Sequence, residues 1–150
     1  MNFGLTSGVI TTLGLMVGLH SGTHSRLAVI GGILTIAVAD ALSDALAMHI
    51  SEESENRHTV RQIWISTGAT FTTKLLMALT FMIPVLLFEL STAIIAGILW
   101  GLCVVTAVSY RLAKTQGIPP WKVIGEHVFI ALLVIAVTHL VGDWVRAVFT

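Results

Sequence analysis

Hydrophobic residues along the chain gather into five long runs that short polar links separate. The runs cover about residues 3–19, 27–50, 65–88, 92–110 and 123–143. Each run is at or near the roughly 20 residues that an α-helix needs to cross a bilayer. No link is long enough to hold a second folded domain. The pattern therefore predicts an all-α integral membrane protein, a single domain over residues 1–150 with five transmembrane helices.

The composition supports a membrane protein and excludes some partners. Hydrophobic residues make up 55% of the chain and charged residues only 11%, whereas a soluble domain carries about 25% charged residues. Eight basic and eight acidic residues cancel, so no basic surface for nucleic acid is expected. We therefore expect the lipid bilayer as a partner and no nucleic acid.

The distribution of basic residues predicts how the helices are oriented. Cytoplasmic links of membrane proteins carry an excess of Lys and Arg. The links that are predicted to lie inside hold Arg57, Arg61, Arg111, Lys114 and Lys122. The opposite side holds only Arg26 and Arg146. The N-terminus is therefore predicted inside and the C-terminus outside, which agrees with an odd number of spans.

Two aspartates lie one helical turn apart inside the second apolar run. Asp40 and Asp44 point from one face of a helix, and Met48 continues that face one turn on. A carboxylate in hydrocarbon is costly and usually functional. Hard divalent cations prefer carboxylate oxygens, and softer ions such as Fe²⁺ also accept a thioether. With the hydroxyl of Ser43 beside Asp44, this face predicts a site for a metal ion or a proton.

Lys74, in the third run, offers a structural explanation for the same aspartates. Counted from the inner ends of their helices, Asp44 and Lys74 lie at similar depths, so they could form an ion pair. A lysine at this depth could also extend to the interface. One salt bridge would neutralise only one carboxylate. Both interpretations, a transport site and a structural Asp44–Lys74 pair, therefore stay open.

Polar residues at the inner end of the second run form a weaker candidate. If the helix continues past the membrane, His49, Glu52, Glu53 and Glu55 could collect cations at a pore mouth. A solvated helix end explains the same residues equally well.

Histidines near the predicted outer face are a further candidate. His20 and His24 stand four residues apart, but the intervening Ser-Gly-Thr at residues 21–23 predicts a turn that would break helical geometry. His139 and Asp143 in the fifth run have helical spacing, although polar capping at an interface is the more common role.

No motif in the chain indicates an enzyme. The sequence holds no phosphate loop, no nucleophile motif and only one cysteine, Cys103. The spacing of Asp40 and Asp44 is similar to the second half of the signature of membrane CDP-alcohol phosphotransferases, but the first half is absent. We therefore expect no enzyme, and a membrane phosphotransferase is the least favoured alternative.

Three segments carry a resemblance to a known family. They are residues 6–19 (TSGVITTLGLMVGL), residues 40–55 (DALSDALAMHISEESE) and residues 138–142 (THLVG). With Pro84 in the third helix, these segments resemble the vacuolar iron transporters over essentially the whole chain. The resemblance implies a five-helix homodimer that exports Fe²⁺ or Mn²⁺ from the cytosol in exchange for protons. It also implies a metal path between the subunits, lined by the first two helices, and no permanently bound cofactor.

The chain departs from the family's pattern at the residues that line the path. The family's pore aspartate falls on Ser7, its methionine on Asp44 and an upstream glutamate on Ile36. The family's glutamate-rich cytosolic domain is reduced to the link at residues 51–62. We therefore expect a short member of prokaryotic type in the cell membrane, with weak cytosolic metal loading.

The sequence thus predicts a proton-coupled transporter of a divalent transition metal. Asp40 and Asp44 would bind the metal or protons, and Ser7, Ser43 and Met48 would be weaker ligands. The first alternative is a membrane scaffold that transports nothing and holds a structural Asp44–Lys74 pair.

Overall fold

The computed structural model describes the chain from residue 2 to residue 149, and its side chains from residue 5 onward. This part of the chain forms six α-helices and no strand. The helices are α1 (Asn2–Thr23), α2 (Arg26–Ser54), α3 (Val60–Thr80), α4 (Met82–Leu87), α5 (Leu90–Gln116) and α6 (Pro120–Phe149).

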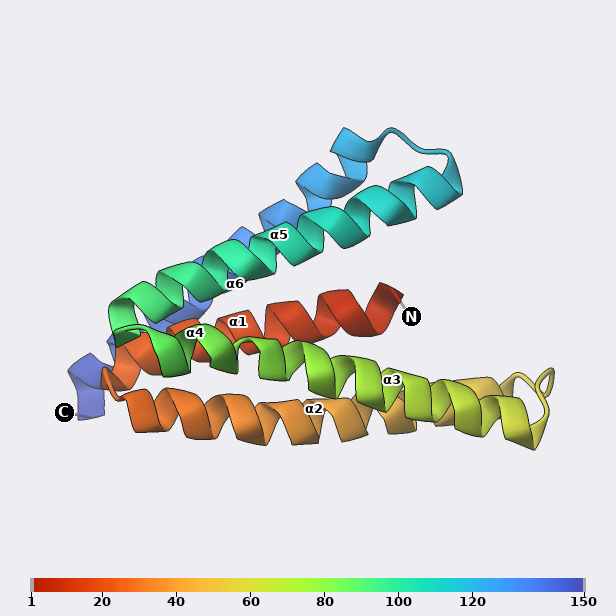
Figure 1. Cartoon of the computed structure of the whole chain (residues 1–150), viewed down its shortest axis with the longest axis horizontal. Coiled ribbons are helices and arrows are strands. Elements are labelled where there is room, and N and C mark those ends of the chain that lie inside the picture. Colours follow the sequence, from red (N-terminus) through yellow and green to blue (C-terminus); the bar gives the residue numbers. More distant parts are fainter. Residues whose placement is uncertain (1, 150) are drawn as a thin grey trace.

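The first helix, α1, is the centre of the molecule. It packs against α2, α3, α5 and α6, and Figure 1 shows it between the α2–α3 pair and the α5–α6 pair. Val9, Leu13 and Met16 of α1 are completely buried. Because the apolar residues of this helix are distributed around it rather than on one face, it can bury side chains against four neighbours.

Four helical segments in the described part are long and apolar enough to cross a membrane. They are Arg26–Ser54, Val60–Leu87, Leu90–Gln116 and Pro120–Phe149. Their outward faces carry large hydrophobic side chains, such as Leu42, Leu99 and Leu140, which are 55%, 60% and 66% exposed. A surface of this kind suits lipid rather than water. The protein is therefore an all-helical, multi-pass membrane protein, as predicted.

The ends of the helices lie near polar residues that the apolar runs did not include. α2 continues to Ser54, about one turn past its predicted end. Thr59 and Gln62 form a capping box at the start of α3. Gly117, with φ of 68°, ends α5 in the left-handed conformation that glycine adopts readily.

The third predicted helix, residues 65–88, is broken in the structure. α3 ends at Thr80 and α4 begins at Met82. Pro84 explains the break, because proline lacks the N–H that would bond to the carbonyl of Thr80, and its ring crowds that carbonyl. The two pieces together still form one candidate span.

The turn that was predicted at residues 21–23 is wrong. α1 continues through Thr23, and the positive φ of this link, 51°, is at His24, just after the helix. Contacts with α6 stabilise this last turn of helix: the Ser21 hydroxyl donates to the carbonyl oxygen of His139 at 2.9 Å. A Cβ built on Gly22 would lie 3.3 Å from the carbonyl oxygen of Gly142. Tertiary packing therefore overrides the local turn signal.

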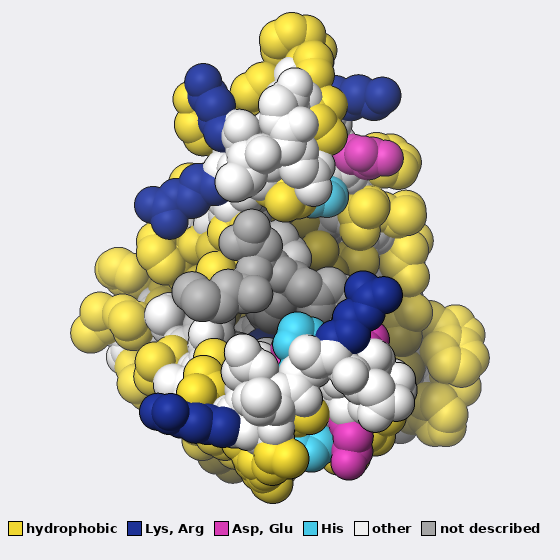
Figure 2. All heavy atoms as spheres, turned by 90° about the vertical axis from the view of Figure 1, so that its right-hand side faces the viewer, with side chains coloured by type: hydrophobic (Ala, Val, Ile, Leu, Met, Phe, Trp, Pro, Cys, Tyr) yellow, Lys and Arg dark blue, Asp and Glu magenta, His cyan; other side chains and the backbone are white. Residues whose placement is uncertain are grey.

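The two chain termini lie at opposite ends of the molecule, and the basic links lie at one of these ends. Figure 1 shows the N- and C-termini at opposite ends, with the α2–α3 and α5–α6 connections on the N-terminal side. Figure 2 looks onto this side and shows Lys and Arg side chains in its upper and lower parts. The basic links that were predicted inside therefore share one end of the molecule.

Candidate functional site

The candidate site lies where α2 and α3 pack closely and α1 crosses them. Small residues on α2, namely Ala37, Ala41 and Ala45, are buried, and α2 and α3 are in contact over much of their length. The adjoining face of α2 carries Asp40 and Asp44, one turn apart. Helical periodicity therefore turns both carboxylates to the same side of α2.

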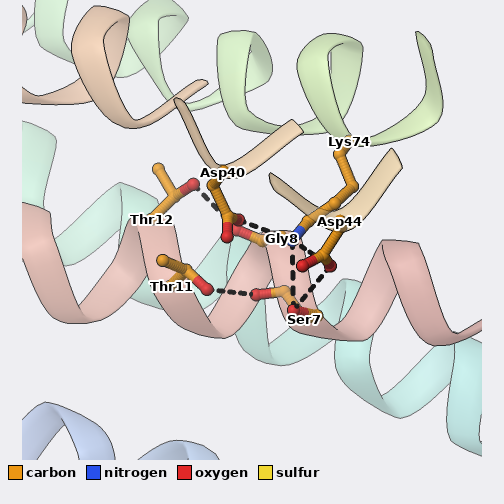
Figure 3. Close-up of polar contacts among 7 residues, drawn as sticks. All are labelled: Ser7, Gly8, Thr11, Thr12, Asp40, Asp44 and Lys74. Atoms are coloured by element: carbon orange, nitrogen blue, oxygen red, sulfur yellow. Dashed lines mark hydrogen bonds and ion pairs between the residues drawn. The ribbon is translucent and has the colours of Figure 1, made fainter. Parts of the chain in front are cut away.

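Lys74 of α3 joins the two aspartates. Its Nζ lies 2.7 Å from Oδ2 of Asp40 and also forms an ion pair with Oδ2 of Asp44. The same ammonium donates to the Ser7 hydroxyl of α1 at 3.2 Å. Figure 3 shows the lysine reaching between the aspartates toward Ser7. The structure therefore gives Lys74 two carboxylate partners, where a single ion pair with Asp44 had been considered.

Lys74 is enclosed by protein. Its side chain is 1% exposed, whereas the side chains of Asp40 and Asp44 are 22% and 21% exposed. The α1 backbone passes over the lysine at Gly8, where an added Cβ would lie 3.5 Å from Lys74 Cε. The lysine therefore lies at the buried side of the site, and the two carboxylates lie at the side that a ligand can reach.

One oxygen of each carboxylate remains available. In the part of the chain that the structure describes, Oδ1 of Asp40 and Oδ1 of Asp44 have no hydrogen-bond or ion-pair partner. Neither atom is among the buried polar atoms that lack a partner, so both reach the surface of the chain. Two accessible carboxylate oxygens on one helix face can accept a cation.

The formal charges of this cluster do not balance. Two carboxylates and one ammonium leave one net negative charge, and no other charged side chain in the described residues pairs with them. A charge in an apolar span is costly. A bound cation or a proton would remove the imbalance.

The weaker predicted ligands are only partly brought to the cluster. Ser7 belongs to it, because its hydroxyl also lies 3.4 Å from Oδ2 of Asp44. Ser43 is exposed on the neighbouring face of α2, and Met48 is half-buried one turn beyond Asp44. Neither has a hydrogen bond to the cluster among the described contacts.

The predicted cation-collecting residues at the inner end are not brought together as one site. His49 Nδ1 lies 3.0 Å from the Thr67 hydroxyl, and Glu52 accepts a hydrogen bond from Ser66. These contacts join α2 to α3. Glu53 and Glu55 are exposed, and Glu55 lies 3.8 Å from His58. The geometry therefore favours helix packing and a solvated helix end.

The histidines at the other end lie between α1 and α6. The rings of His20 and His24 are 5.2 Å apart, and Asp143 accepts a hydrogen bond from Ser21 at 2.5 Å. His139 Nε2 lies 3.4 Å from Asp143 Oδ2. Burial, together with the nearby histidines, lowers the pKa of His20. The link between Ser21 and Asp143 had no signal in the sequence, because 122 residues separate them.

The described residues of one chain do not supply a complete metal site. Among the described residues, no group of three or more His, Cys, Asp and Glu side chains is arranged to hold a metal ion. The cluster offers two carboxylates, so a metal ion would need further ligands from water or from a second copy of the chain.

Comparison with protein-family models, curated proteins and solved structures found no match to this chain. The geometry of the Asp40–Asp44–Lys74 cluster is therefore the main guide to function.

Proposed function

We propose that this protein transports a divalent transition metal, Fe²⁺ or Mn²⁺, out of the cytosol in exchange for protons. Asp40 and Asp44 bind the metal ion or the protons. The observation that carries the proposal is that two carboxylates share one ammonium inside an apolar span. Each charge at the centre of a membrane costs about 2.5–3.5 kcal/mol on insertion scales. Reversible binding of a cation would give a function to the one carboxylate charge that Lys74 does not neutralise.

The proposed molecule is a homodimer of five-span subunits with the N-terminus inside. α1 would be the additional span, because its 22 residues, at about 1.5 Å per residue, are long enough to cross a hydrocarbon core of about 30 Å. α2 supports the dimer, because Ala39, Ser43 and Ala47 form an exposed row of small residues beside the aspartates. Small residues let helices approach closely in lipid. A second copy at this row would add two carboxylates and bring the number of ligands closer to what a divalent ion requires.

The proposed ion is a transition metal because one soft group, the thioether of Met48, lies on α2 one turn from Asp44. Met48 follows Asp44 by one turn toward the inner end of α2, and a thioether binds Fe²⁺ better than it binds Ca²⁺ or Mg²⁺. Ser7 contributes a hydroxyl from α1. The resemblance to vacuolar iron transporters points to the same ions.

The test is metal efflux by the Asp44→Asn variant. Purified protein in proteoliposomes that contain a metal-sensitive dye should move Mn²⁺ or Fe²⁺ when it is wild-type. Asp44→Asn should lose nearly all of this activity, because the remaining carboxylate is balanced by Lys74. Glu126→Gln, which removes an exposed carboxylate of α6, is the control and should keep wild-type rates. Wild-type transport by Asp44→Asn would contradict the proposal.

A structural membrane scaffold is the second candidate, and the complete burial of Lys74 between two aspartates favours it. A scaffold would move neither metal nor protons in proteoliposomes. It would lose stability in Lys74→Met, which leaves two aspartates unpaired, and recover it when Asp40→Asn and Asp44→Asn are added. Metal transport by the wild-type protein would exclude the scaffold, whatever the stability measurements on the variants show.

A further inference from the structure

We propose that Lys74 is the residue that sets how tightly this site binds a divalent cation. Its ammonium is a tethered positive charge that cancels one aspartate and limits how tightly a divalent ion binds. The inference rests on the proposed cation site and adds a role that neither aspartate has. This role also gives a reason for a lysine beside the two aspartates, although its charge repels the metal ion.

The lysine and an incoming ion meet different atoms of the carboxylates. Lys74 contacts Oδ2 of Asp40 and Oδ2 of Asp44, and the Oδ1 atoms of both residues stay accessible. Figure 3 shows the ammonium reaching the aspartates from α3. A cation can therefore bind at the Oδ1 atoms while the lysine keeps its own contacts.

The structure holds the lysine in place. Lys74 is 1% exposed, α1 covers it at Gly8, and its ammonium contacts Ser7 as well as both aspartates. The groups that face the ammonium from α1 and α2 are thus one hydroxyl and two carboxylates. A side chain with this many contacts does not extend to the interface. Its charge is therefore a fixed part of the site.

A fixed positive charge acts differently on ions of different valence. The Coulomb repulsion between Lys74 and a bound ion doubles when the ion carries two charges instead of one. The lysine therefore weakens binding of divalent ions more than binding of monovalent ions, and it favours release of the ion. In a dimer, two clusters carry two net negative charges, which one divalent ion balances.

A series of variants that changes the charge of the site in steps tests the proposal. Lys74→Met leaves two negative charges, and Asp44→Asn leaves none. The wild-type protein and the double variant Asp44→Asn/Lys74→Met each keep one. Titration of purified protein in detergent with Mn²⁺ should show tightest binding by Lys74→Met, tighter than wild-type by about tenfold or more. Asp44→Asn should bind weakest, and the double variant should bind more tightly than Asp44→Asn.

Transport kinetics separate this role from a structural one. In proteoliposomes, Lys74→Met should lower both KM and the maximal rate for Mn²⁺, because the ion binds more tightly and leaves more slowly. Lys122→Met removes an exposed lysine outside the cluster and is the control, so it should stay near wild-type affinity. A purely structural lysine would not tighten Mn²⁺ binding when it is removed.

The results distinguish failure of this inference from failure of the proposed function. If wild-type protein transports Mn²⁺ but Lys74→Met binds it no more tightly, the role of Lys74 is overturned and the transport function stands. If Lys74→Met does not fold, the double variant decides, because it must bind Mn²⁺ more tightly than Asp44→Asn alone. If no protein in the series binds or moves Mn²⁺, both proposals are overturned.

Discussion

Lys74 is enclosed by three helices and meets two carboxylates with one ammonium group. The sequence placed Asp44 and Lys74 at similar depths, but spacing along one helix cannot say which side chains of two helices meet. The structure shows that Asp40 shares the same lysine. It also shows that the hydroxyl of Ser7 lies in the same cluster.

Removal of both carboxylates should destabilise the protein strongly. Asp40→Asn/Asp44→Asn leaves the Lys74 ammonium buried without an anionic partner, which costs about 3–5 kcal/mol when a buried pair is broken. Thermal unfolding in detergent should therefore occur at a clearly lower temperature than for wild-type. The same double change combined with Lys74→Met should recover much of the loss, and a failure to recover would mean that the ion pairs do not explain the stability.

Helix contacts at glycine decide how α1 and α6 pack. A Cβ built on Gly142 of α6 would lie 2.4 Å from the carbonyl oxygen of Gly18 and 2.9 Å from the backbone nitrogen of Gly22. The two backbones are therefore close enough that only glycine fits at residue 142. Nothing in the sequence alone indicated that α6 packs against the glycines of α1.

Gly142→Ala should push α1 and α6 apart and lower stability by about 1–3 kcal/mol, as overpacked contacts commonly do. Gly125→Ala is the matched control on α6, because an added Cβ there has no neighbour within 4 Å. This control should keep or slightly raise stability, since alanine favours a helix more than glycine does. Thermal unfolding of both variants in the same detergent checks the difference, and equal stability would contradict the close contact.

At the scale of the whole molecule, α1 is the central helix, and its neighbours bury much of it. The exposed row Ala39, Ser43 and Ala47 of α2 lies beside the aspartates and is free of large side chains. A second copy that packs on this row would bring two Asp40–Asp44 pairs close together. The dimer is therefore proposed at α2, with α1 contributing its Ser7 side.

Cysteine cross-linking tests that interface. Single cysteines at residues 39, 43 and 47, each in a Cys103→Ser background, should give an oxidised dimer for at least one position, because a disulfide forms only when Cα atoms approach within about 7 Å. Ala136→Cys on the exposed side of α6 is the control and should stay monomeric. Gel electrophoresis without reductant reads the result. Cross-linking at residue 136 alone would place the interface elsewhere.

The sequence by itself determined that the chain is helical and crosses a membrane, and it singled out Asp40, Asp44 and Lys74. Apolar runs of membrane-spanning length and charges inside them are local properties, so they can be read without a fold. Only the tertiary structure decided that α1 lies at the centre, that residues 21–23 stay helical and that both aspartates share one lysine. These features depend on contacts between helices far apart in the chain, as the pairing of Ser21 with Asp143 illustrates. Helical periodicity gives the face on which a residue lies, but packing determines its partner.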